Sequence, residues 1–160
     1  MVEPDADQLT LTRARRGVRE YPVAVRTRKA PITVDRLLAR ARSTLVRVDA
    51  AQAAEELHQG ALIVDIRPLE QRTESGEIPG AVVINRNVLE WRLDPASPWR
   101  IPQAADPNMR IIVVCAEGFS SSLAAATLQE LGLVNATDLI GGFNAWRDAG
   151  LPIRPFEAGA

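Results

Sequence analysis

The chain of 160 residues contains a single cysteine and a single histidine. One cysteine cannot form an internal disulfide, and one cysteine with one histidine cannot complete a structural zinc site without several carboxylates. We therefore expect a free thiol, no metal and no cofactor.

Long apolar runs are also missing. No run approaches the ~18 to 20 residues that a membrane-spanning helix needs, and the N-terminal stretch MVEPDADQLT is acidic and lacks the apolar core of a signal peptide. With 46% hydrophobic and 24% charged residues, the composition is ordinary for a soluble globular protein. These observations predict a cytoplasmic protein without a membrane partner.

Charge is distributed unevenly along the chain, although the formal net charge is only −1. Residues 1–44 carry ten basic and five acidic side chains, whereas residues 45–160 carry nine basic and fifteen acidic ones. A basic arm can bind RNA, an anionic partner or a sister subunit, but a solvated or self-docked extension is the commoner explanation. We do not expect nucleic-acid binding, because no aromatic residues interleave with the arginines. The oligomeric state stays open.

The arm contains one segment with helical spacing. In ITVDRLLARARS (32–43), apolar residues recur at near-helical intervals and Thr33 is a suitable N-cap. We predict a basic N-terminal extension over 1–44 that is loosely ordered over 1–30, with a short helix near 33–43. A domain over 45–155 and a tail over 156–160 complete the predicted organisation.

Short apolar segments alternate with helical or loop stretches from residue 45 onward. Asp49 is placed to cap a helix that Gly60 ends. Strands that are short and apolar, interleaved with helices, indicate a parallel sheet covered on both faces and hence the α/β class. The expected strands lie at 45–48, 62–66, 81–84, 111–115 and 137–140.

Cys115 follows one of these strands in IIVVCAEGFSSSLAAATLQEL (111–131). Open parallel sheets bind ligands beyond the carboxyl ends of their strands. Gly118 can adopt positive φ, so the amides of the loop 116–120 can curl around one point ahead of a helix that begins near Ser121. Such a cradle would stabilise a thiolate and lower its pKa below the usual ~8.5. We favour a reactive nucleophile over a packing cysteine.

Three stretches together resemble a known family. LIVDIRPLEQRTESGEIPGAVVI, IIVVCAEGFSSSLAAATLQELGL and LIGGFNAWRDAGLPI occur in the order and spacing of single-domain rhodaneses, which are sulfurtransferases. The resemblance covers about residues 45–153 and leaves out the N-terminal arm. It implies a rhodanese-like α/β fold with a central parallel five-stranded sheet and helices on both faces.

The resemblance also implies a reaction. Cys115 would take sulfane sulfur from a donor, thiosulfate or a persulfide, carry it as a persulfide, and pass it to cyanide or a thiol. The loop amides would hold the terminal sulfur, and the hydroxyl of the helix-starting serine would satisfy an orphan amide. The implied binding loop comprises Ala116, Glu117, Gly118, Phe119, Ser120 and Ser121.

Charge in the loop limits the choice of donor. Glu117 brings a carboxylate to the loop, and Ser120 stands where some members of the family have arginine. Like-charge repulsion should therefore disfavour thiosulfate, which makes a protein persulfide or a low-molecular-weight persulfide the favoured source. A related phosphatase or arsenate-reductase chemistry would require arginine at position 121, where this chain has serine.

The remaining candidates are interpreted as structural. Asp65 and Arg67 match the family's Asp-x-Arg and are expected to form an ion-paired scaffold, although Arg67 could approach the pocket. We expect Phe119 to pack in the core rather than line the pocket, and His58 to lie at a helix C-terminus. Weak substrate contacts are conceivable for Trp91, Arg92 and Trp99, and a packing role for Trp146.

Two functional readings remain open at this point. The first is an active sulfurtransferase. The second is a non-enzymatic module for sulfur relay or redox exchange, in which Cys115 reacts only within a complex of partners. An inactive regulatory domain is disfavoured, because such domains have usually lost the cysteine.

Overall fold

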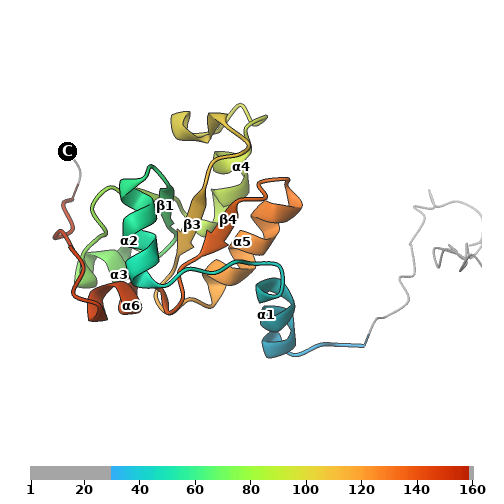
Figure 1. Cartoon of the computed structure of the whole chain (residues 1–160), viewed down its shortest axis with the longest axis horizontal. Helices are drawn as coiled ribbons and strands as arrows, with labels where there is room; N and C mark the ends of the chain where they lie inside the picture. The colour runs from blue at the N-terminus through green and yellow to red at the C-terminus, as the bar shows by residue number, and fades with distance from the viewer. Residues whose placement is uncertain (1–29, 159–160) are drawn as a thin grey trace, which may run out of the picture. The chain divides into compact units, whose positions relative to one another are not determined.

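A computed structural model of the chain describes residues 30–158 (Figure 1). These residues fall almost entirely within one compact unit, Thr33–Ala160. The predicted loose order of residues 1–30 lies outside the described residues, apart from Ala30. Among the described residues, no helix has the length and apolarity needed to cross a bilayer.

Four parallel strands form the sheet, in the order β2-β1-β3-β4. Their bounds are Val82–Val83 for β2, Leu62–Asp65 for β1, Ile111–Val114 for β3 and Ala136–Asp138 for β4. The pairing of β1 with β3 joins Leu62 to Ile111 and Asp65 to Val114. The α/β class is thereby confirmed, and all four strands point their carboxyl ends toward the same edge.

The predicted fifth strand at 45–48 is reduced to an isolated bridge. Val48 pairs in parallel with Leu139 outside any named strand, and Val46 is exposed. The reason is local: Asp49 begins a helix immediately afterwards through a capping box with Gln52, so the chain leaves the sheet edge after one residue. The sheet of the described residues therefore has four strands, not five.

Helices cover both faces of the sheet (Figure 1). One face carries α2 (Ala50–His58) and α6 (Gly142–Asp148), with α3 (Leu69–Ser75) on the same side in Figure 1, and the other carries α4 (Leu89–Leu93) and α5 (Ser120–Glu130). Alternation along β1 sorts the core, since Ile63 packs with the α2 and α6 side and Val64 with the α4 and α5 side. Short 3₁₀ turns, η1 (Arg86–Val88) and η2 (Pro102–Ala105), complete the element list.

Helix α1 (Val34–Arg42) precedes the sheet and packs against α5. The Thr33 hydroxyl accepts from the Arg36 amide at 3.2 Å, as expected of an N-cap. None of its residues is fully buried. Helix α1 therefore belongs to the same compact unit as the sheet, and it brings the end of the basic arm next to the start of α5.

Candidate active site

Cys115 lies directly after β3, at the carboxyl edge of the sheet, and the residue is 7% exposed. The loop that follows is short, because α5 already begins at Ser120. Strand, loop and helix therefore hold the sulfur at the N-terminal end of an 11-residue helix, where the helix dipole favours negative charge.

Gly118 shapes this loop. Its φ of +80° lies in the left-handed region, and a Cβ there would come within 2.8 Å of the Gly141 nitrogen. In this conformation the Gly118 N–H donates to the Cys115 Sγ at 3.1 Å. The glycine thus both turns the loop and supplies one amide of the predicted cradle.

The pKa of the Cys115 thiol is lowered from its ordinary value. Burial raises it, but hydrogen bonds from the side chains of Ser121 and Ser120 and from the backbone amides of Ser121 and Glu117 together outweigh the burial. The Ser121 Oγ lies 3.2 Å from Sγ. A lowered pKa increases the thiolate fraction at neutral pH, and the thiolate is the nucleophile.

Behind Ser121 lies Asp138, a fully buried residue at the end of β4 that the sequence analysis did not single out. The Ser121 and Ser122 hydroxyls donate to its Oδ2 at 2.9 and 2.7 Å. Arg47 donates to both carboxylate oxygens, at 2.7 and 3.1 Å. This bidentate ion pair fixes the orientation of the buried carboxylate.

The arrangement allows the thiol to ionise without leaving a polar atom unsatisfied. While the thiol is protonated, it donates to the Ser121 oxygen, and Ser121 donates to Asp138. After ionisation, the Ser121 hydrogen can turn toward the thiolate, because Asp138 keeps its bonds from Ser122 and Arg47. Ionisation of the Cys115 thiol therefore does not depend on a histidine base. The single histidine, His58, is exposed at the end of α2.

Helix α6 holds the other side of the loop. The Phe143 and Asn144 amides donate to the carbonyls of Cys115 and Ala116, at 2.8 and 3.0 Å. This close approach requires Gly142, whose φ is +61° and whose Cβ would fall 2.4 Å from the Cys115 carbonyl oxygen. The backbone on both sides of the sulfur is therefore fixed.

Asp65 and Arg67 form a buried ion pair at the end of β1. Arg67 Nη2 donates to Asp65 Oδ2 at 2.7 Å and to the Gly76 carbonyl at 2.8 Å. Its guanidinium also lies 3.6 Å from the centroid of the Phe143 ring. These contacts connect β1 to the end of α3 and to α6, so the ion pair lies where it can hold these three elements together.

The outer part of the loop is more open. Glu117 and Ser120 are exposed. Phe119 is 53% exposed, so the prediction that it packs in the core is wrong. A helix N-cap position at the mouth of the loop turns its ring outward, where the Arg42 guanidinium lies 5.6 Å from the ring centroid.

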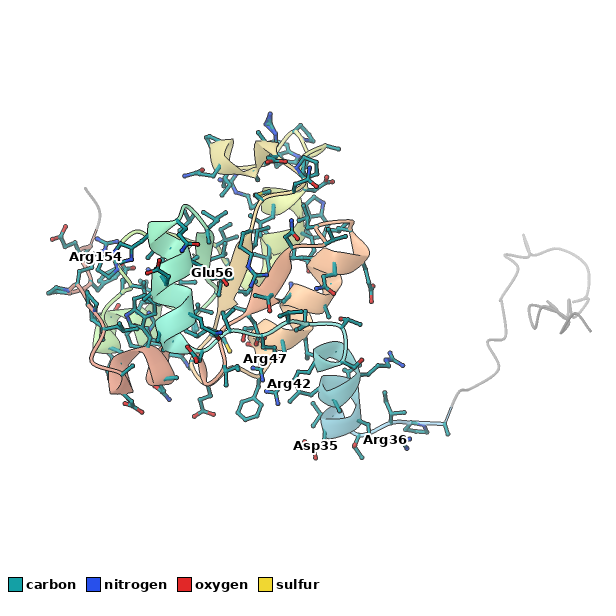
Figure 2. The ribbon with its side chains drawn as sticks, viewed as in Figure 1. Asp35, Arg36, Arg42, Arg47, Glu56 and Arg154 are labelled. Carbon is teal, nitrogen blue, oxygen red and sulfur yellow. The ribbon has the colours of Figure 1, made fainter. Side chains whose placement is uncertain are left out.

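Two arginines that precede the sheet reach the same loop. Arg42 of α1 and Arg47 of the following segment both donate to the Gly118 carbonyl, at 2.8 and 3.2 Å. Figure 2 shows these two side chains beside each other near the end of α1. No local sequence signal identifies them, because they are 76 and 71 residues away from Gly118.

For the aromatic segment after β2, no comparable contact with the active-site loop is seen among the described residues. Trp91 and Trp99 are exposed, and Arg92 donates to the carbonyl of Trp99 at 2.7 Å. Their role as substrate contacts stays a prediction. Trp146, by contrast, is buried among the residues of the α2 and α6 side, and its indole donates to the Pro152 carbonyl at 2.9 Å.

Comparison with known proteins finds the same family that the sequence resembles. Residues 49–149, more than half of the chain, match the model of the rhodanese-like domain. The thiosulfate sulfurtransferase GlpE of Haemophilus influenzae is 35% identical over 102 residues, which cover 64% of this chain and 88% of the relative. GlpE of Pseudomonas fluorescens SBW25 is 40% identical over 99 residues, covering 61% and 78%.

A solved structure shows that the likeness extends to three dimensions. A Rhodopseudomonas palustris protein of unknown function, described as a possible tyrosine phosphatase, is 34% identical and superposes with a TM-score of 0.71. The match covers 81% of this chain and 99% of that one. The present chain therefore belongs to the rhodanese-like family, and the sulfurtransferase class that its sequence predicts is confirmed.

Proposed function

We propose that this enzyme carries sulfane sulfur as a persulfide on Cys115, taken from thiosulfate or a persulfide and passed to a thiophilic acceptor such as cyanide or a thiol. The observation that carries the proposal is the low-pKa thiol, surrounded by amide and hydroxyl donors at the carboxyl edge of the sheet. Such a site activates a nucleophile without a neighbouring base.

The reaction proceeds in two displacements. In the first, the Cys115 thiolate attacks the outer sulfur of the donor, a new S–S bond forms, and the donor fragment leaves with the bonding electron pair as sulfite or a thiolate. In the second, the acceptor attacks the outer sulfur of the persulfide, and Cys115 leaves as the thiolate. The donors around Sγ stabilise the anion that begins and ends the cycle.

Phosphoryl chemistry fits this site less well. Ser121 stands six residues after Cys115, and its hydroxyl lies against the sulfur. A phosphate or arsenate oxyanion would need a guanidinium there for a bidentate clamp. The loop has the acidic Glu117 and no basic residue.

The location and the domain limits are part of the proposal. A free, reactive thiol persists in a reducing compartment, which supports the cytoplasm as the location. We assign catalysis to residues 45–155, with the donor and acceptor being small molecules or proteins, and residues 156–160 to a short tail.

Intact-protein mass spectrometry tests the proposal directly. The protein is incubated with thiosulfate, or separately with a low-molecular-weight persulfide, and then with cyanide. We expect the wild type to gain one sulfur atom and to lose it to cyanide, whereas Cys115→Ser gains none. Because the chain has one cysteine, this variant is a complete control.

The donor that loads the protein identifies the effect of Glu117. Faster loading by a neutral or thiol-based persulfide than by thiosulfate is expected if the exposed carboxylate repels the dianion. If neither donor loads the wild type while Cys115 remains open to alkylation, the persulfide-carrier proposal is wrong.

A further inference from the structure

The Gly118 carbonyl of the active-site loop accepts hydrogen bonds from two arginines that precede the sheet. It accepts from Arg42 Nη2 at 2.8 Å and from Arg47 Nη2 at 3.2 Å, whereas the Ser122 hydroxyl gives its one hydrogen to Asp138 at 2.7 Å. Both arginines precede residue 49, where the match to the rhodanese-like domain begins. This part of the chain therefore adds contacts to the site from outside the matched region.

These contacts fix the orientation of one peptide plane. No peptide bond among the described residues is cis, so the Gly118 carbonyl and the Phe119 N–H point in opposite directions across a planar unit. Holding the carbonyl toward the arginines turns the Phe119 N–H away from them. Charge-assisted hydrogen bonds to the carbonyl also polarise the peptide, which makes this N–H a stronger donor.

Arg42 differs from Arg47 in its charge balance. Arg47 is paired with the buried carboxylate of Asp138. Within residues 30–158, Arg42 has no carboxylate at salt-bridge distance, and its Nε donates instead to the Ser122 hydroxyl at 3.1 Å. The loop itself carries only the acidic Glu117. Of the two arginines that contact this loop, Arg42 is thus the one whose charge no carboxylate of residues 30–158 balances.

We propose that Arg42 is a positioning and specificity residue for Cys115: it holds the Gly118–Phe119 peptide and favours anionic reagents at the sulfur. Applied to the proposed function, on which this reading rests, Arg42 offsets Glu117 and keeps anionic donors such as thiosulfate accessible to the enzyme. Arg47 donates to the same carbonyl, so the loop keeps one of its two arginine donors when Arg42 is replaced.

Alkylation with two reagents tests this inference without any sulfur donor. Iodoacetate is an anion and iodoacetamide is neutral, and both react with the same thiolate. The ratio of their rate constants therefore cancels changes in the thiolate fraction and in the fraction folded. We expect Arg42→Gln to lower the ratio of iodoacetate to iodoacetamide rates roughly threefold, an effect that added salt reduces.

Two further variants define the result. Arg36→Gln removes the same charge from an exposed position on α1 and should leave the ratio unchanged. Arg42→Lys keeps the charge without the forked guanidinium and should retain more than half of the effect. A wild-type ratio in Arg42→Gln, an equal fall in Arg36→Gln, or a fall in Arg42→Lys as large as that in Arg42→Gln would overturn the inference.

The outcome is independent of the sulfur-loading experiment. If no donor loads Cys115 but the alkylation ratio depends on Arg42, the proposed function fails and the role of Arg42 stands. If sulfur is loaded and released but the ratio is insensitive to Arg42, the role of Arg42 fails and the proposed function stands.

Discussion

Ionisation of Cys115 depends on one hydroxyl hydrogen that has two acceptors within reach. The Ser121 Oγ lies 3.2 Å from Sγ and 2.9 Å from Asp138 Oδ2. Asp138 is already bonded by Ser122 and by the Arg47 fork, so it can give up the Ser121 hydrogen at little cost. The buried carboxylate therefore acts through Ser121 by holding its hydroxyl in place, and does not touch the sulfur itself.

Replacing this hydroxyl should change the pH dependence of the thiol. In Ser121→Ala we expect the pKa of Cys115 to rise, because burial still raises it and the largest opposing hydrogen bond is gone. Iodoacetamide alkylation at pH 7 should slow by roughly three- to tenfold, and its midpoint should move to higher pH. The control is Ser43→Ala, an exposed hydroxyl that donates to the Arg40 carbonyl at 2.7 Å.

The same pKa shift carries a sign for stability. A thiol whose folded pKa lies below its unfolded value of ~8.5 stabilises the fold fully above pH ~8.5 and loses that contribution as pH falls through the folded pKa. The Ser121→Ala variant should therefore gain less stability than wild type as pH rises toward 8.5. An unchanged alkylation profile in this variant would contradict the role assigned to Ser121.

At the scale of elements, the sequence predicts the cysteine loop but not the distant side chains that contact it. The cysteine, its loop and the start of α5 are contiguous, so strand pattern, glycine and serine sufficed to place the site. The partners of the loop are not contiguous: Arg47 reaches Asp138 across 91 residues. A pairing of this kind depends on the assembled sheet, and no local periodicity encodes it.

The edge of the sheet shows the same limit. The apolar pattern of LVRV favours a strand, but the cap at Asp49 begins α2 and leaves only the Val48 bridge. Phe119 is likewise an apolar residue of a type usually found in a core, but its position at the N-cap of α5 turns its ring to solvent. In both cases the geometry of a neighbouring helix start outweighs the local hydrophobic preference.

The contact between the cysteine loop and α6 should be sensitive to one methyl group. Gly142→Ala places a Cβ 2.4 Å from the Cys115 carbonyl oxygen at a φ of +61°, so clash and backbone strain add. We expect the free energy of unfolding to fall by about 3 kcal/mol, measured by urea denaturation, with lower thiol reactivity in the folded protein.

Gly132→Ala is the matched control for this change. Gly132 also has positive φ, +95°, but a Cβ there would meet nothing within 4 Å. Its expected cost is about 1 kcal/mol, from backbone strain alone. Equal losses in the two variants would show that the close approach of α6 to the loop contributes nothing to stability.

At the scale of the whole molecule, the contribution of an ion pair to stability depends on whether the pair is buried or exposed. The side chains of Asp65 and Arg67 are each 1% exposed, and the pair connects β1, the end of α3 and α6 at the carboxyl edge of the sheet. Arg110, directly before β3, pairs with Glu56 of α2 at the surface, and their side chains are 31% and 28% exposed. Desolvation makes the loss of one partner costly in the first case, and solvent screening makes it cheap in the second.

Paired substitutions should therefore separate the two sites. Arg67→Met leaves the Asp65 carboxylate buried without its partner, and we expect a loss of about 3 to 5 kcal/mol in urea denaturation. Arg110→Met should cost about 1 kcal/mol or less. Adding Asp65→Asn to Arg67→Met removes the stranded charge and should recover part of the loss. If Arg67→Met is no more destabilising than Arg110→Met, the pair is not the scaffold of this edge, and the fixed position of the Cys115 loop must come from α6 and the arginines alone.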